Sequence, residues 1–398
     1  MIGRVVLLAD ASAQYSIAGL SQLDRLLRTL EECFGPSLTE GKGPEVLILW
    51  QGCPPGLRNP PASRLPITYQ EASESVGPGP RSNTLVLRSN VVFRRGVLAR
   101  LLRSSDPHPS FARLGPEDFP ASWDRLQGAT EGARTDEYVW VIQNPAEVPA
   151  VARQLLRASG KPTDGFASRT LNRPLSQLVS RVLVGTPITP NQISFFVLAV
   201  LLVSLWILAR GTPAGFIIGM LLFQLASVLD GCDGEIARAK FLESPWGTLL
   251  DTGVDLLGNF LLPIAIAVGL SRAVGLSAEL RNEYLLEGGL TAAGIALGIL
   301  ALARARPREN RTDFNDFGSS TIERVGMPRP LATLLYGVTQ LLRRDSYVLV
   351  FFVFAIIGQP ALILHFLAVG MALHLPVIAW TWWANARIPA PLKVPDQS

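Results

Sequence analysis

Four aspartates stand close together in the sequence, at Asp230, Asp233, Asp251 and Asp255. Side chains three or four residues apart share one face of a helix, so each of the two pairs presents two carboxylates in the same direction. The segment between the pairs is short, which makes two antiparallel neighbouring helices the expected arrangement. We therefore expect the four carboxylates to converge near one end of a helix pair.

Divalent cations are the expected partners of these carboxylates. Four uncompensated negative charges in an apolar setting would cost a great deal of free energy. Ligand sets made only of carboxylates suit Mg²⁺, Mn²⁺ or Ca²⁺, and four acids could hold two ions, which we expect to be Mg²⁺ or Mn²⁺. Two bound ions in turn fit a diphosphate, because they bridge its oxygens and stabilise a leaving phosphate.

Small and basic residues around the aspartates fit a phosphate ligand. Gly234, Ala237 and Gly247 leave room for a ligand to approach the helix backbone, and Arg238 can pair with a phosphate or with one of the acids. A structural ion-pair cluster or GxxxG-like helix packing would explain the glycines. It would not explain four acids against one or two bases, so we favour a metal–diphosphate site.

Two other functions compete with this interpretation. A membrane prenyltransferase also uses Asp-rich helices to bind Mg²⁺-diphosphate, but it usually places two Asp motifs in distant repeats, and this sequence has no second copy. A divalent-cation transporter would distribute acids through the depth of the bilayer. Here the acids gather at one surface, and the other apolar segments offer almost none.

The composition predicts a membrane protein rather than a soluble or disordered one. Hydrophobic residues make up 48% of the chain and charged residues only 17%, whereas an ordinary soluble domain is about a quarter charged. The sequence has no basic block with interleaved aromatics, so a nucleic-acid partner has no support. Cys33, Cys53 and Cys232 show no CxxC spacing and can build neither a disulfide framework nor a zinc knuckle.

Residues 1–160 are predicted to form a soluble α/β domain. Two short β-type runs flank a segment with helical spacing of its leucines, which together predict a βαβ unit. The N-terminus lacks the apolar length of a signal peptide, so we expect this domain to stay in the cytoplasm. The expected elements are strands at Val5–Ala9, Val46–Trp50, Thr84–Leu87 and Tyr138–Ile142, a helix over Leu20–Cys33, and a Pro/Gly-rich loop over Gly52–Pro80.

Residues 163–186 show the pattern of a helix that lies in a membrane interface. Leucines and valines fall on one helical face, and arginines, serines and a glutamine fall on the other. An ordinary amphipathic helix that packs on the α/β domain would show the same pattern. Because a membrane span begins only a few residues later, we favour the interface.

Residues 187–390 are predicted to form an all-α membrane domain of six transmembrane helices. Thr189 and Pro190 suit the start of the first helix, as its N-cap and first helical residue. All but one of the apolar runs approach or exceed the about 17–25 residues that a bilayer crossing needs. The expected spans are 192–209, 214–236, 247–270, 285–303, the shorter run 346–358, and 361–384.

The distribution of positive charge predicts the orientation in the membrane. Segments on the side of the N-terminal domain would hold twelve Lys and Arg residues, against three in the opposite loops, in agreement with the positive-inside rule. We therefore expect a multi-pass protein of the cell (inner) membrane, with membrane lipids around it and the aspartates on the cytoplasmic side. Arg304, Arg306 and Arg308 could bind an acceptor phosphate, although topology alone explains most of these arginines.

The spacing D-x2-D-G-x2-A-R-x8-G-x3-D-x3-D, which starts at Asp230, resembles the signature of the CDP-alcohol phosphotransferases. The resemblance extends over about residues 163–384. It implies transfer of a substituted phosphate from a CDP-linked donor to an alcohol acceptor with release of CMP, as in phospholipid biosynthesis, and a homodimer. It also implies metal binding by Asp230, Asp233 and Asp251, metal binding and base catalysis by Asp255, and a cytidine diphosphate site at Gly234, Ala237, Arg238 and Gly247.

Two further stretches resemble bifunctional inositol-phosphate enzymes, which join a cytidylyltransferase to a di-myo-inositol phosphate phosphate synthase. The junction around 161–191 is similar to theirs and suggests an inositol-phosphate acceptor, with glycerol phosphate as an alternative. The N-terminal domain resembles a sugar nucleotidyltransferase in outline. It lacks the Gly-rich basic loop after the first strand, where 9–15 read ADASAQY, and it has Leu87-Arg88-Ser89-Asn90 where a metal-binding Asp is expected. We therefore expect this domain to be inactive as a nucleotidyltransferase.

Overall fold

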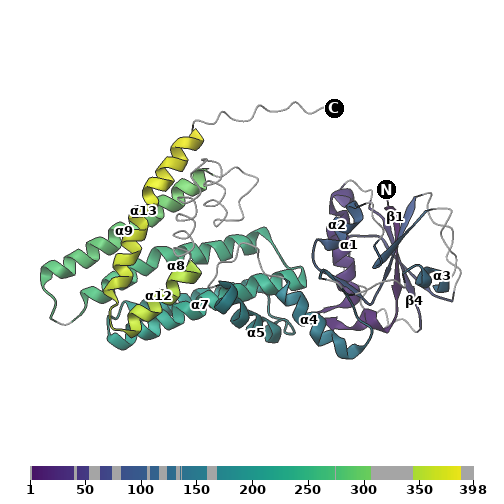
Figure 1. Cartoon of the computed structure of the whole chain (residues 1–398), viewed down its shortest axis with the longest axis horizontal. Helices are drawn as coiled ribbons and strands as arrows, with labels where there is room; N and C mark the ends of the chain where they lie inside the picture. Colours follow the sequence, from purple (N-terminus) through teal and green to yellow (C-terminus); the bar gives the residue numbers. More distant parts are fainter. Residues whose placement is uncertain are drawn as a thin grey trace. The chain divides into compact units, whose positions relative to one another are not determined.

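A computed structural model of the chain describes most of the sequence (Figure 1). The described residues are 2–39, 43–52, 63–73, 82–104, 108–115, 123–130, 135, 137–158, 168–273, 275–305 and 344–386.

The chain divides into two units, each of which has its own packing. The α/β unit contains Met1–Ser159, Ser180–Pro187 and Glu235–Leu242, and the helical unit contains Gly160–Val179, Ile188–Gly234 and Glu243–Ser398.

The α/β unit is built on a five-stranded mixed sheet with strand order β5-β4-β1-β6-β8. β1 pairs in parallel with both β4 and β6, and β4 with β5, whereas β8 runs antiparallel to β6. The predicted βαβ unit is confirmed, because α1 connects β1 to its parallel neighbour β4. The bounds are β1 Ile2–Ala9, α1 Gln22–Thr39, β4 Glu45–Trp50, β5 Ile67–Glu71, β6 Asn83–Arg88 and β8 Phe111–Leu114.

One expectation for this unit is wrong. The Pro/Gly-rich stretch Gly52–Pro80, which we expected to be a loop, contains the edge strand β5. Ile67 and Tyr69 pack against the core under α1, while Thr68 is exposed, and this alternation is too short to stand out beside so many Pro and Gly residues. The predicted strand near residue 140 is confirmed as β9 (Val139–Val141), which pairs with β7 (Val91–Phe93) in a separate sheet.

Helices cover both faces of the sheet, as the alternation of strand residues requires. Val5 and Leu7 of β1 pack on the side of α1 and α2 (Val97–Arg103), whereas Val6 and Leu8 pack on the side of α3 (Trp123–Gly128). Figure 1 shows α1 and α2 on one side of the strands and α3 on the other. The remaining short elements are η1 Ala11–Gln14, β2 Ser16–Ile17, β3 Leu20–Ser21, η2 Pro145–Glu147 and α4 Val148–Arg157.

The helical unit consists of long apolar helices whose starts are marked by the sequence. α6 begins at Pro190 behind a capping box, in which Thr189 Oγ1 accepts from Gln192 N and the Gln192 side chain accepts from Thr189 N. α8 begins at Pro245 behind the N-cap Ser244. The helices are η3 Ser168–Asn172, α5 Arg173–Leu183, α6 Pro190–Leu208, α7 Pro213–Lys240, α8 Pro245–Ser271, α9 Ala278–Ala305, α12 Arg344–Ile356 and α13 Ala361–Ala386.

The prediction of six transmembrane helices is wrong for the described residues. Four helices there are long and apolar enough to cross a membrane: Pro190–Leu208, Pro213–Lys240, Pro245–Ser271 and Ala278–Leu300. The run at 346–358 stays short because α12 ends at Ile356, close to Gly358 with its φ of +73°. The described apolar part of α13, Ala361–Leu373, is also shorter than a span.

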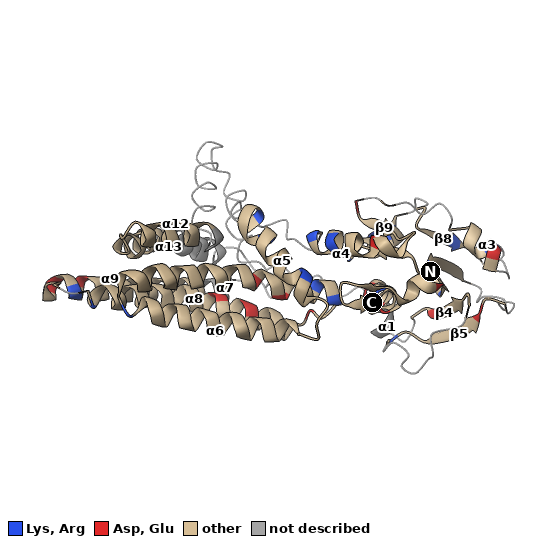
Figure 2. Ribbon diagram, turned by 90° about the horizontal axis from the view of Figure 1, so that it is seen from below, with Lys and Arg blue, Asp and Glu red and all other residues tan. Residues whose placement is uncertain are grey.

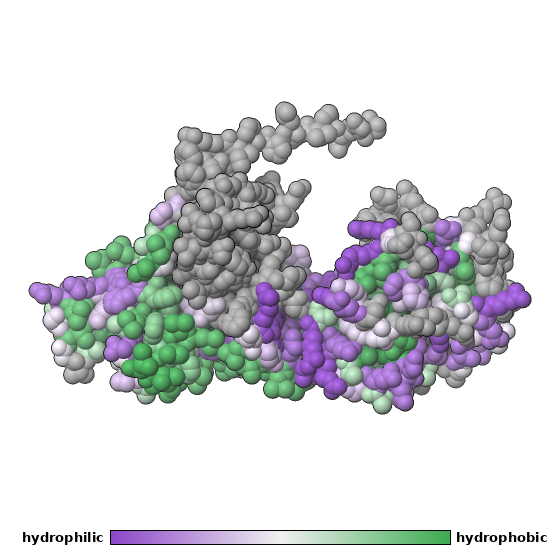
Figure 3. All heavy atoms as spheres, viewed as in Figure 1, coloured by the Kyte–Doolittle hydropathy of each residue, from purple (hydrophilic) through white to green (hydrophobic). Residues whose placement is uncertain are grey.

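Close contacts between helices depend on small residues. Gly258 of α8 lies against the Leu201 side chain of α6, where a Cβ would come within 3.1 Å of Leu201 Cδ2. Ser204 of α6 donates a hydrogen bond of 2.7 Å to the Gly219 carbonyl oxygen of α7. α8 also packs against α9, and α9 against α13. In Figure 3 the helical unit shows broad apolar areas on its surface, as expected for helices that face lipid.

Helix α5 has the reverse of a soluble protein's polarity. Its side chains Leu178 and Val182 are exposed, at 59% and 70% accessibility, while Ser176 and Ser180 are buried, as is Asn172 just before the helix. An amphipathic helix that packs on a soluble domain would bury its leucines instead. The interfacial placement of residues 163–186 stays a prediction, and residues 163–167 lie outside the described residues.

Candidate active site

The two aspartate pairs lie on two successive helices, as the spacing predicts. Asp230 and Asp233 lie near the C-terminal end of α7, and Asp251 and Asp255 lie in the first three turns of α8. The segment between Lys240 and Pro245 is short. Figure 2 shows that charged residues are sparse along most of the length of α6 to α9.

Asp233 is the most buried of the four aspartates, with 6% of its surface accessible. Ser194 of α6 donates a hydrogen bond from its hydroxyl to Asp233 Oδ2. The backbone N–H of Gly234 donates to Asp233 Oδ1 over 2.5 Å. Both carboxylate oxygens therefore have a donor, which fixes the side chain and offsets part of the cost of burying its charge.

The start of α6 contacts both motif helices. Besides the bond from Ser194 to Asp233, the amide oxygen of Asn191 lies 3.1 Å from the position that a Cβ on Gly247 would occupy. A larger residue at 247 would press against Asn191 and Ser244. Neither Asn191 nor Ser194 was predicted as a site residue. Two signals in the sequence could have pointed to them. The capping roles of Thr189 and Pro190 do not explain the asparagine that follows, and a serine inside an apolar helix, such as Ser194, needs a polar partner.

The remaining aspartates are half-buried. Asp230, Asp251 and Asp255 are each partly accessible, although Oδ1 of Asp255 itself is buried. Asn259 lies one turn after Asp255 on α8, and Tyr347 of α12 donates its hydroxyl to Asn259 Oδ1 over 2.6 Å. Asn259 is on the same face of α8 as Asp251 and Asp255, and this face is therefore hydrogen-bonded to α12 through Tyr347.

The chemistry of the donor set fits hard divalent cations, because four carboxylates supply oxygen ligands only. In the part of the chain that the structure describes, no three His, Cys, Asp or Glu side chains are gathered into a group that could hold a metal ion. Convergence of all four carboxylates on two ions stays a prediction.

The other predicted site residues are distributed along α7 and α9. Gly234, Ala237 and Arg238 follow Asp233 on α7, with Ala237 buried and Arg238 half-buried. Arg304 lies in the last turn of α9, and its side chain is outside the described residues, as are Arg306 and Arg308. The structure therefore leaves the acceptor-phosphate prediction untested.

Polar groups of the α/β unit bond to one another where a nucleotide site would be expected. At the carboxyl ends of β1 and β6, Asp10 Oδ1 accepts from Ser12 N over 2.8 Å and from Ser89 Oγ over 3.1 Å. The hydroxyls of Ser12 and Ser89 lie 2.7 Å apart. This edge of a parallel sheet is where nucleotides bind in many α/β folds, but here Asp10 caps η1 instead.

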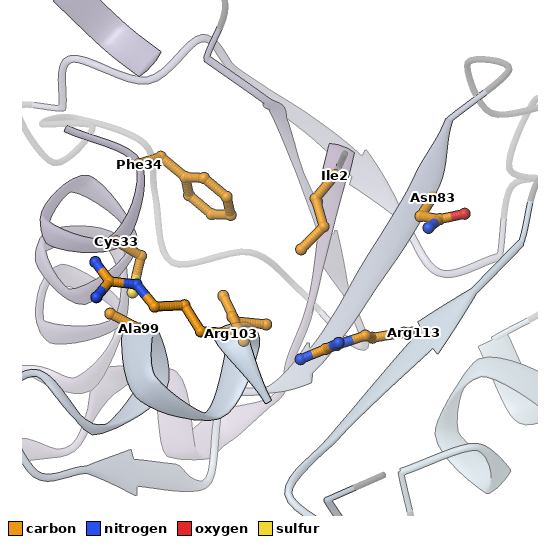
Figure 4. A pocket seen from close by; sticks show the side chains of 8 residues that line it. Ile2, Cys33, Phe34, Asn83, Ala99, Arg103 and Arg113 are labelled. Atoms are coloured by element: carbon orange, nitrogen blue, oxygen red, sulfur yellow. The ribbon is translucent and has the colours of Figure 1, made fainter. Parts of the chain in front are cut away.

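A cavity of about 310 Å³ lies at the opposite edge of the sheet, near the first residues of β1 and β6. Its lining includes Cys33, Phe34, Arg103 and Arg113, as Figure 4 shows. Burial raises the pKa of the Cys33 thiol to about 12. Cys33 is therefore a packing residue rather than a nucleophile, because the thiolate is the reactive form.

A bundle of apolar helices, with paired aspartates on two of them, defines a membrane-type helical domain with an acidic site. Residues 187–307 match the model of the family described as CDP-alcohol phosphatidyltransferase. The match includes both aspartate pairs, Gly234, Ala237, Arg238 and Gly247. Asn191 and Ser194 also fall inside it.

Three relatives of this chain share one name. A "Bifunctional IPC transferase and DIPP synthase" from Thermococcus kodakarensis is 39% identical over 131 residues, which is 32% of this chain and 29% of the relative. Proteins of the same name from Rubrobacter xylanophilus and Aquifex aeolicus are 30% and 35% identical, over 44% and 33% of this chain. The chain matches only 39% and 30% of the length of those two relatives.

Proposed function

We propose that this chain is an integral-membrane CDP-alcohol phosphotransferase. It transfers a substituted phosphate from a CDP-linked donor to an alcohol acceptor and releases CMP. The observation that carries this proposal is the family match over residues 187–307, which contains both aspartate pairs at the family's spacing. The hydrogen bonds at Asp233 and the close approach of Asn191 to Gly247 support it, because they link the two halves of the motif through α6.

Asp255 is the proposed general base. It takes the proton of the acceptor hydroxyl as that oxygen forms a bond to the donor's β-phosphorus, and the bond between this phosphorus and the bridging oxygen of CMP breaks. Arg238 binds a phosphate of the donor, since a guanidinium matches phosphate oxygens in pairs. Gly234, Ala237 and Gly247 let the cytidine diphosphate approach the helices closely.

Two divalent cations, Mg²⁺ or Mn²⁺, are the proposed cofactors. Asp230, Asp233 and Asp251 would hold them, with help from Asp255. When bound, such ions neutralise the charge of a diphosphate and of the phosphate that leaves. Ser194 orients Asp233 within the helix bundle, because its hydroxyl donates a hydrogen bond to the buried carboxylate.

The proposed location is the cell (inner) membrane, with the aspartates on the cytoplasmic side. After an even number of membrane crossings a chain is on the side where it started. The four spans α6 to α9 would therefore bring the chain back to the side of its N-terminal domain. The arginine-rich stretch after α9 and the residues Arg238 and Lys240 then lie inside. We further propose that α5 lies in the membrane interface and that the enzyme is a homodimer in the membrane.

The proposed acceptor is an inositol phosphate, with Arg304, Arg306 and Arg308 as candidates to bind its phosphate. The shared name of the three relatives, which contains DIPP synthase, supports this choice. The α/β domain is proposed to be inactive as a nucleotidyltransferase, so another enzyme would have to supply the CDP-linked donor. A panel of inositol phosphate, glycerol phosphate and free inositol as acceptors tests the assignment.

One comparison separates this function from the two alternatives. The purified protein is supplied with Mg²⁺ or Mn²⁺ and with either CDP-linked donors or prenyl diphosphates, and liposomes that contain it are assayed for uptake of Mn²⁺. Release of CMP only with CDP-linked donors supports the proposal. Release of diphosphate from a prenyl donor, or Mn²⁺ uptake without CMP release, would contradict it.

A further inference from the structure

The polar face of α5 packs on the motif helix at the first aspartate pair. Gln224 of α7 donates a hydrogen bond of 2.8 Å to the Asn172 side chain, and both residues are buried. Just over two turns later on α7, the Cys232 thiol lies 3.4 Å from the Ser176 carbonyl oxygen. The start of α5 is thereby fixed against the segment that carries Asp230 and Asp233.

Gly231 makes this close approach possible. A Cβ at residue 231 would lie 3.1 Å from Ser176 Oγ and 3.2 Å from Ser176 Cβ, which is tighter than side chains normally pack. The same position lies 3.5 Å from Nη1 of Arg173. The guanidinium of Arg173 is therefore held beside the backbone of Gly231, the immediate neighbour of Asp230.

We propose that Arg173 binds a phosphate group of a substrate next to Asp230. This inference rests on the proposed function and adds a residue that lies outside both the aspartate motif and the matched segment 187–307. The motif supplies four carboxylates and one arginine, Arg238. A phosphate group that binds beside the aspartates is therefore surrounded by more negative than positive charge. The guanidinium of Arg173, next to Asp230, would be a second positive partner for this phosphate.

The chemistry of arginine suits this role better than that of lysine. A guanidinium stays charged and presents two parallel N–H donors to two oxygens of one phosphate. Arg173 is half-buried, so its charge is less screened by water than that of an exposed arginine. Its backbone is also anchored, because Ser176 donates its hydroxyl to the Arg173 carbonyl oxygen over 3.2 Å.

Two substrate groups are candidates for binding to Arg173: the diphosphate of the CDP-linked donor and the phosphate of the acceptor. The experiment measures the affinity of the purified full-length protein, with Mn²⁺ present, for three probes: CDP, CMP and inorganic phosphate. It compares wild type with R173Q, R173K and the control R210Q. Arg210 suits the control because it lies beyond the opposite end of α6, with its guanidinium 5.0 Å from the ring centroid of Trp206.

The expected result is a loss of affinity of about 10- to 100-fold in R173Q, the range for a charged hydrogen-bonded pair, and a smaller loss in R173K. Weaker CDP binding with unchanged phosphate binding assigns Arg173 to the donor, and the reverse assigns it to the acceptor. R210Q is expected to match wild type for all probes.

Unchanged affinities in R173Q and R173K would overturn the inference, as would a lower melting temperature with wild-type affinities, which is the signature of a structural arginine. If R173Q does not fold, R173K decides, and wild-type affinities in that variant overturn it. The proposed function is tested separately, by CMP release. If the wild-type protein binds the probes but releases no CMP, the proposed function fails, whereas the affinities that test Arg173 can still be measured.

Discussion

The hydroxyl of Ser194 on α6 donates a hydrogen bond to the carboxylate of Asp233 on α7, across 39 positions of sequence. The bond joins the first long helix of the helical unit to the aspartate motif. Because both groups are buried, water cannot easily replace either partner. The position of the Asp233 side chain therefore depends on a helix that carries none of the four aspartates.

Removal of this hydroxyl should impair both stability and activity. In S194A the buried carboxylate loses one donor, at a cost of about 1–3 kcal/mol. We expect the melting temperature to fall and kcat/KM for CMP release to drop roughly tenfold, which equals about 1.4 kcal/mol of transition-state stabilisation.

The matched control is S204A, in the same helix. Ser204 is also buried and also donates to α7, but its acceptor is the Gly219 carbonyl oxygen, far from the aspartates. S204A should lower the melting temperature while the kcat/KM of the folded protein stays near wild type. Equal losses of kcat/KM in the two variants would show that Ser194 acts only through helix packing.

A second prediction concerns the contact between α6 and α8. A Cβ on Gly269 would collide with the Leu208 carbonyl oxygen, which is backbone and cannot move aside, and would lie 3.0 Å from the Phe216 ring. G269A should therefore destabilise the protein by about 1–3 kcal/mol, as overpacking does. G253A, in the same helix, should be neutral or stabilising by about 0.5–1 kcal/mol, because among the described residues nothing lies within 4 Å of its Cβ position. Thermal unfolding of both variants in the same detergent makes the comparison, and an equally stable G269A contradicts the packing.

Much of the fold could be predicted from local patterns. The βαβ unit follows from leucines at helical spacing between two apolar runs, and α6 to α9 follow from runs of apolar residues that end in Pro, Gly or charge. Strand β5 was missed because five residues at a sheet edge give only a short alternation. Six spans were predicted because hydropathy marks apolar segments, whereas the length of a helix also depends on backbone conformation, and α12 ends at Ile356, close to Gly358 with its positive φ.

The candidate site was predictable only where its residues are close in sequence. The spacing of the aspartates places each pair on one helix, and the structure agrees. Ser194, Asn191 and Arg173 were not predicted, because their roles come from contacts with residues that lie 39 to 58 positions away in the sequence. Periodicity describes which face of a helix is polar but does not identify the partner that this face meets.

The thiol of Cys33 should be unreactive below strongly alkaline pH. Burial raises its pKa from 9.0 to about 12, so at pH 8 its thiolate fraction, and with it the alkylation rate, should be about a thousandfold lower than for an ordinary thiol. The stabilisation from the partly buried neutral thiol is fully present below pH 9 and is lost as the pH rises toward 12, because the unfolded state loses its proton first. Iodoacetamide labelling, read by peptide mass spectrometry, makes the test, and rapid labelling of Cys33 in the folded protein at pH 8 would refute the burial.

The α/β domain should not turn over CTP. Asp10, Ser12 and Ser89 bond to one another at the edge where a nucleotidyltransferase would bind its substrate. Full-length D255N, which removes the proposed phosphotransfer, should release no pyrophosphate from CTP with Mg²⁺ and a sugar phosphate. Pyrophosphate release above a no-enzyme blank would show that the domain is active.

The most direct test of the account is CMP release by the purified full-length protein and by its D255N variant, with Mn²⁺ and a CDP-linked donor, with and without inositol phosphate. The account predicts CMP formation that depends on metal and acceptor in the wild type and falls by at least about a hundredfold in D255N, the contribution of a general base. No CMP from the folded wild type with any donor or acceptor, or equal CMP formation by D255N, would contradict it.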